Sequence, residues 1–118
     1  MAKKKQVIQK NYLEKIPIRS EKVDWKTEEN GSITLLIENT GWANRIAQKL
    51  FGKPKVSFVH LDEMGSFLWP RLSGEMNIIE LGEITKEEFG QKAEPLYERL
   101  CRYFQILHSY HFIEFKEL

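Results

Sequence analysis

The chain has 118 residues, and a hydrophobic fraction of 42% suffices for one folded core and excludes a disordered chain. No apolar run approaches the roughly 18 residues that a bilayer-spanning helix needs, and the lysine-rich start lacks the apolar segment of a signal peptide. Cys101 is the single cysteine, so no intrachain disulfide can form, and we expect a cytoplasmic protein without a membrane-embedded part.

Charge is unevenly distributed along the chain. Residues 1–26 contain eight Lys/Arg and three Asp/Glu, a net of +5, whereas residues 27–118 contain ten and fourteen, a net of −4. A duplex-binding protein usually carries its positive charge on the folded domain, so this pattern argues against nucleic acid as a partner. We expect residues 1–11 to be a flexible basic tail and residues 12–118 to form a single domain.

Residues 22–39 predict a β-hairpin. Apolar and polar residues alternate on both sides of Asn30-Gly31, the pair that best tolerates the positive φ angles of a type I′ turn. The segment before it, residues 12–20, is expected to be extended at most, because it contains a proline.

The next segment predicts a helical insertion and then a third strand. In residues 40–54 apolar residues recur at helical spacing, and Gly52 and Pro54 end the pattern. Residues 56–61 are rich in β-branched and aromatic residues, which favours a short strand. The basic residues of this region predict either a solvated helix face or a docking patch for an acidic partner: Arg45, Lys49, Lys53 and Lys55.

From Asp62 onward the apolar period becomes that of a helix. A first helix is expected from Glu63 to Leu72, kinked or ended near Pro70. Gly65 interrupts this helix at a cost of about 1 kcal/mol relative to alanine, so a structural reason for it is expected.

Two further helices complete the predicted fold. The second begins after Asn77, which approximates a capping box with Glu80, and stops at Gly90. The third runs from about Pro95 to Ser109, and the last eight residues form a short strand or tail. Because the strands are grouped before the helices, the sequence predicts an α+β fold.

The third helix has more apolar surface than one core contact needs. A core stripe and a solvent face account for most of its residues, but Arg99, Tyr103, Ile106 and Tyr110 form a further face. The core stripe and this further face together occupy about 220° of the circumference of the helix. Either the protein's own sheet or N-terminal segment covers this face, or it lines a groove beside the third strand that is open to a partner.

Residues 56–113 contain a set of short motifs in a fixed order and spacing: Leu61-Asp62, Gly65, Leu68-Trp69, Leu72, Ser73-Gly74, Ile79-Glu80-Leu81 and Phe112-Ile113. In this order they resemble the coenzyme PQQ synthesis protein D (PqqD-like) family, also called the RiPP recognition element. RiPPs are ribosomally made, post-translationally modified peptides. Residues 40–55 depart from the compact members of this family.

The resemblance implies a winged helix-turn-helix-like fold: a three-stranded antiparallel sheet followed by three helices, here with a short helical insertion before the third strand. It also implies a non-catalytic role, in which the leader of a precursor peptide adds as an extra strand to the third strand and rests against the third helix. Asp62 would cap the first helix, and Gly65 would let it approach a neighbour closely. The implied peptide-binding residues are Val56, Ser57, Phe58, Val59, His60, Arg99, Arg102, Tyr103, Ile106 and Tyr110.

A separate peptide-modifying enzyme, of the radical-SAM type, would then receive the bound peptide, and Arg99 or Arg102 could hold an acidic leader residue. The alternatives are a winged-helix DNA-binding regulator and a homodimer that pairs through the third strand. We expect no cofactor and no catalysis. His60, His108 and His111 lack a Cys/His zinc framework, and Cys101 lies on the core stripe. Trp69 is expected in the core, the alternative being a binding platform.

Overall fold

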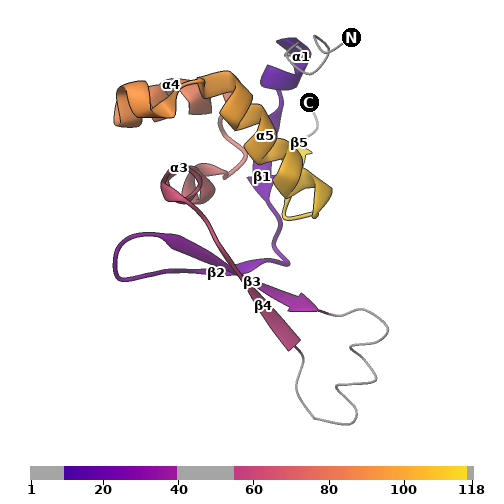
Figure 1. Cartoon of the computed structure of the whole chain (residues 1–118). Coiled ribbons are helices and arrows are strands. Elements are labelled where there is room, and N and C mark those ends of the chain that lie inside the picture. Colours follow the sequence, from indigo (N-terminus) through magenta and orange to yellow (C-terminus); the bar gives the residue numbers. More distant parts are fainter. Residues whose placement is uncertain (1–9, 40–54, 117–118) are drawn as a thin grey trace, which may run out of the picture.

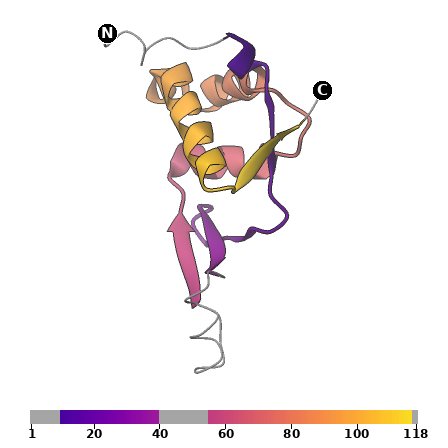
Figure 2. The same cartoon turned by 90° about the vertical axis from the view of Figure 1, so that its right-hand side faces the viewer.

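The computed structural model describes residues 10–39 and 55–116. Its main sheet has three antiparallel strands in the order β2 (Asp24–Thr27), β3 (Ile33–Asn39) and β4 (Lys55–His60). Three α-helices follow along the chain: α3 (Glu63–Leu68), α4 (Ile78–Phe89) and α5 (Leu96–Ser109). Figures 1 and 2 show these helices gathered above one end of the sheet. The predicted α+β class is confirmed.

A second, two-stranded sheet joins the two ends of the described chain. β1 (Ile16–Arg19) pairs antiparallel with β5 (Ile113–Lys116), and Ile16 lies opposite Lys116. The sequence predicted an extended segment at residues 12–20 and a short strand or tail in the last eight residues, but it did not predict that the two pair with each other. The short helix α1 (Lys10–Leu13) precedes β1 and begins inside the segment that we expected to be a tail.

The hairpin between β2 and β3 is confirmed, but the predicted turn type is wrong. The turn contains three residues between Glu28 and Ser32, and the Gly31 N–H donates to the Glu28 carbonyl at 3.0 Å. Gly31 has a φ of +90°, whereas Asn30 does not have a positive φ. Asn30 instead accepts hydrogen bonds through its side chain from the Ser32 backbone and hydroxyl. This is a type I turn with a glycine bulge, the usual geometry of a three-residue hairpin loop.

Helix boundaries follow the predicted signals. Asp62 caps α3 by accepting from the Gly65 N–H at 2.7 Å, and a 3₁₀ turn (Trp69–Arg71) replaces the α-helix where Pro70 occurs. The capping box of α4 has both of its hydrogen bonds, and Gly90, at a φ of +59°, ends that helix. The 3₁₀ turn Gly90–Ala93 leads into α5. The predicted insertion at 40–54 lies outside the described residues.

The core lies between the sheet and the three helices. Trp69 and Phe104 are its largest fully buried side chains, so Trp69 belongs to the core as predicted. One inward face of β3 and one stripe of each helix supply the remaining members, among which are Ile33, Leu35, Leu68, Leu81, Leu100 and Leu107. Within residues 10–39 and 55–116, no helix is long and apolar enough to cross a membrane.

Candidate peptide-binding groove

β4 is an edge strand of the main sheet: among the described strands, only β3 pairs with it. The Leu61 N–H donates to the Ile33 carbonyl at 2.9 Å. This hydrogen bond shows which residues of β4 direct their backbone groups toward β3 and which direct them away. Because backbone groups alternate in direction along an antiparallel strand, Val59 directs its N–H and C=O toward β3. The same alternation directs the backbone groups of Val56, Phe58 and His60 toward the outer edge.

An apolar groove of about 440 Å³ lies beside this edge, on the face of the sheet that meets the helices. Val59 and Leu61 form its sheet side, and residues of α5 and the turn after it form the other side. Every lining residue is aliphatic or aromatic: Val59, Leu61, Tyr103, Ile106, Leu107, Tyr110 and Phe112. Such a surface can bury apolar side chains of a ligand but offers few polar groups for orientation.

Tyr103 has a structural role as well as a place in the groove. Its hydroxyl donates to the Gly65 carbonyl at 3.0 Å, which ties α5 to α3. A Cβ at Gly65 would lie 3.0 Å from Cε1 of Tyr103 and 3.0 Å from Oδ1 of Asp62. Burial raises the pKa of Tyr103 far above its ordinary value, and the Asp62 carboxylate raises it further. Gly65 therefore permits the close approach that the resemblance implied.

Ile106 and Tyr110 form the solvent-facing wall of the groove. Ile106 is 49% exposed and Tyr110 is 64% exposed, although Tyr110 stacks on Phe112 at 5.5 Å between ring centroids. The sheet therefore does not cover this part of the wide apolar arc of α5. Arg99 and Tyr103, by contrast, contact the protein itself, since Arg99 donates to the Lys92 carbonyl at 2.6 Å.

The structure brings four of the ten predicted site residues together in the groove: Val59, Tyr103, Ile106 and Tyr110. Ser57 shares the inward face of β4 with Val59, whereas Val56, Phe58 and His60 lie on the opposite face. Arg99 and Arg102 lie outside the lining.

The lining also includes Leu61, Leu107 and Phe112, which we did not predict. Leu107 is a buried residue of α5 whose side chain also lines the groove, and the turn after α5 brings Phe112 to it.

The face of the sheet away from the groove has its own contacts. Phe58 is 59% exposed, with the Lys26 ammonium 5.9 Å from the centre of its ring. The Thr34 hydroxyl donates to the Glu28 carboxylate and lies 2.9 Å from Nδ1 of His60. Thr34 is fully buried beneath these neighbours, so His60 has a structural contact here.

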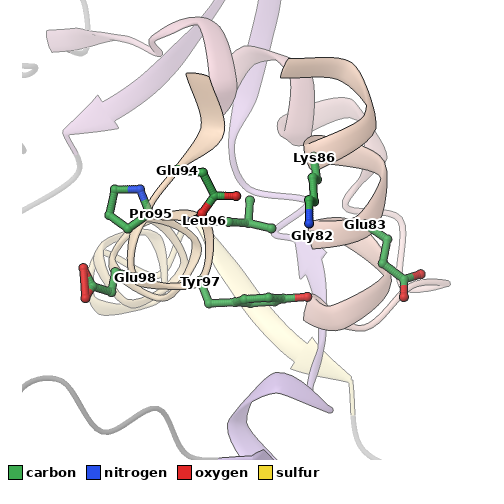
Figure 3. Close-up of a pocket in the computed structure, with 8 residues that line it drawn as sticks. All are labelled: Gly82, Glu83, Lys86, Glu94, Pro95, Leu96, Tyr97 and Glu98. Carbon is green, nitrogen blue, oxygen red and sulfur yellow. Dashed lines mark hydrogen bonds between the residues drawn. The ribbon is translucent and has the colours of Figure 1, made fainter. Parts of the chain in front are cut away.

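A second hollow, of about 550 Å³, lies between α4 and the start of α5. Figure 3 shows the Tyr97 ring reaching from α5 toward Gly82 of α4. Three glutamates and one lysine, all exposed, surround it: Glu83, Glu94, Glu98 and Lys86. None of the predicted site residues lies in this hollow.

The groups that could hold a metal or attack a substrate are dispersed. No three His, Cys, Asp or Glu residues approach closely enough to hold a metal ion within the part of the chain that the structure describes. His108 packs on Phe115, and His111 occupies the turn after α5 with a φ of +64°. Burial raises the pKa of the Cys101 thiol, which disfavours the thiolate that nucleophilic chemistry needs.

Comparisons of this chain with models of known protein families, with curated proteins and with solved structures find no match.

Proposed function

We propose that this protein is a non-catalytic module that binds an extended peptide by strand augmentation. The observation that carries this proposal is an apolar groove running along the inner face of an edge strand. A peptide strand placed beside β4 would exchange backbone hydrogen bonds with Val56, Phe58 and His60. Its alternate side chains would enter the groove, so the backbone would give affinity and the side chains would give register.

The ligand that we propose is the leader of a ribosomally made precursor peptide, which the module presents to a separate modifying enzyme of the radical-SAM type. The resemblance of residues 56–113 to the RiPP recognition element supports this assignment. We also propose that the sheet and helices form a winged helix-turn-helix-like arrangement and that the protein acts in the cytoplasm.

A DNA-binding regulator is the weaker alternative. Duplex DNA is bound through several cationic contacts to phosphates. The groove beside β4 has no charged residue in its lining, and Arg99 is engaged with the Lys92 carbonyl. Arg102 is exposed and makes no ion pair with a described residue, so it is the cation better placed to hold an acidic residue of the peptide.

The test is to search the genes beside this one for a short precursor peptide and to titrate a synthetic copy of its leader into the protein by calorimetry. Ile106→Asp should weaken binding at least about tenfold, because one apolar contact is worth about 1.5–3 kcal/mol and the variant replaces it with a charge. Ile106 is half exposed, so circular dichroism should show an intact fold. Glu98→Ala, on the exposed face of the same helix, is the control and should bind as the wild type does. Equal affinity of a folded Ile106→Asp protein would refute the groove.

A further inference from the structure

Exposed apolar surface is concentrated at one edge of the main sheet. The described residues include five large hydrophobic side chains that are exposed, and four of them flank the β4 edge. Val56 and Phe58 lie on its outward face, and Ile106 and Tyr110 lie beside its inward face. The fifth, Trp25, belongs to β2 at the other edge. A strand added to β4 would contact both faces and cover residues of each.

The two edges of the sheet also differ in their protection against self-pairing. Edge strands are usually blunted by charged residues, by proline or by bulges. β2 follows this rule, since Asp24 and Lys26 are both exposed on it. β4 has Lys55 at its first position, but from Val56 to His60 it contains no acidic residue, no lysine, no arginine and no proline.

We propose that a second copy of this chain occupies the β4 edge, through antiparallel pairing of the two β4 strands about a two-fold axis at Phe58. Phe58 would then lie opposite the partner subunit's Phe58, and Val56 would lie opposite the partner subunit's His60. These three residues direct their backbone groups outward, so each opposed pair exchanges two backbone hydrogen bonds. The opposed phenylalanines form an aromatic cross-strand pair, and no like charges meet among Val56, Phe58 and His60.

Self-association and peptide binding use the same backbone groups, so they exclude one another. This competition, unlike the dimer itself, rests on the proposed function. A peptide that adds to β4 would have to displace the partner subunit, and the monomer would be the form that carries the peptide.

Sedimentation velocity of the purified chain over a concentration series tests the dimer. The wild type should show a reversible monomer–dimer equilibrium. Phe58→Glu places two carboxylates opposite each other and should raise the dimer dissociation constant at least about tenfold. Trp25→Glu, which alters an exposed aromatic residue on the other edge strand, should dimerise as the wild type does. A monomeric wild type at the highest concentration, or an unaffected Phe58→Glu protein, would overturn the proposal.

Disulfide trapping tests the register. In a Cys101→Ser background, Phe58→Cys should form a covalent dimer on mild oxidation, because the Cα atoms of a hydrogen-bonded antiparallel pair are about 5.5 Å apart, within the range of a disulfide. Val56→Cys alone should not, because the two copies of this residue would be four positions out of register, about 13 Å apart. The double variant Val56→Cys/His60→Cys should crosslink. Efficient crosslinking of Val56→Cys alone would refute the axis at Phe58.

Titration of the peptide into the dimer separates the two proposals. Conversion of dimer to a peptide-bound monomer supports both. Peptide binding that leaves the dimer intact refutes the shared edge, whereas a confirmed dimer that binds no peptide refutes the proposed function alone.

Discussion

At the scale of single residues, the contact between Gly65 and Tyr103 determines how α3 and α5 pack. The Tyr103 ring lies against Gly65, while its hydroxyl bonds to the carbonyl of the same residue. The ring is therefore held both by packing and by a hydrogen bond, and it cannot easily withdraw. A side chain at position 65 would also press on the carboxylate that caps α3.

We expect Gly65→Ala to destabilise the protein by about 1–2 kcal/mol, despite the better helix propensity of alanine, because overpacking at a fixed ring costs more than propensity gains. Urea unfolding monitored by circular dichroism measures this change. In a Tyr103→Leu background the same substitution should cost less, since the ring that it meets is gone. If Gly65→Ala lowers the free energy of unfolding equally in the two backgrounds, the Tyr103 ring is not what opposes a side chain at position 65.

Tyr103→Phe should lower the free energy of unfolding by about 1 kcal/mol, because the Gly65 carbonyl loses its donor. Tyr110→Phe on the exposed end of the helix is the matched control and should be neutral within about 0.5 kcal/mol.

The difference between wild type and Tyr103→Phe should also depend on pH. The pKa of Tyr103 is raised in the folded state, so the folded protein holds this proton more tightly than the unfolded chain does. The stability that this adds is complete below pH about 10, the ordinary pKa of tyrosine, and is lost as the pH rises above it. The two proteins should therefore converge in stability at alkaline pH, and a constant gap would contradict this assignment.

At the scale of elements, the β2–β3 hairpin depends on one backbone angle. A Cβ at Gly31 would meet no atom within 4 Å, so space does not require the glycine, but its φ of +90° does. Gly31→Val should therefore destabilise the protein by about 1–3 kcal/mol, and Gly31→Asn should cost less because asparagine tolerates this region. Thermal unfolding of the two variants gives the comparison, and a Val variant as stable as the wild type would mean that the turn is different in solution.

Local signals in the sequence predicted most elements because each depends on a few neighbouring residues. Asn77 with Glu80 marked the start of α4, Gly90 marked its end, and Pro70 marked the end of α3. The type of the hairpin turn was missed because Asn30-Gly31 fits two loop lengths, and the choice depends on how Glu28 pairs with Ser32. The β1–β5 sheet was missed because its strands are distant in sequence and neither has a turn signal beside it.

The groove was predictable only in part for the same physical reason. The helical period of α5 showed an apolar face without a partner, and this identified Tyr103, Ile106 and Tyr110. Whether a residue of that face contacts the protein depends on tertiary packing, which placed Arg99 against the Lys92 carbonyl and Phe112 against Tyr110.

At the scale of the whole molecule, Arg19 connects the two sheets. Its guanidinium donates to the carbonyls of Trp69 and Pro70, its backbone N–H donates to Leu72, and it stacks over Trp25. One residue of β1 thus contacts β2 and the turn after α3.

Arg19→Met, which keeps the length of the side chain, should lower the free energy of unfolding by about 1–2 kcal/mol through the lost hydrogen bonds. Arg19→Lys should rescue only part of this, because the lysine ammonium sits on a shorter stem than Nη1, the guanidinium nitrogen that donates to both carbonyls, and lacks the planar face that lies over Trp25. Chemical denaturation of the three proteins measures the effect, and full rescue by lysine would mean that charge alone is needed.

The pairing of Ile16 with Lys116 also affects the order in which the fold can form. Joining strands this far apart in sequence costs more loop-closure entropy than closing the β2–β3 hairpin, which spans only a few residues, and non-local pairings form more slowly. The hairpin and the helices are therefore expected to form first, and the two ends of the described chain to join last. In the native protein the same strands would open first as a unit, so their amide protons should exchange with solvent sooner than those of β3.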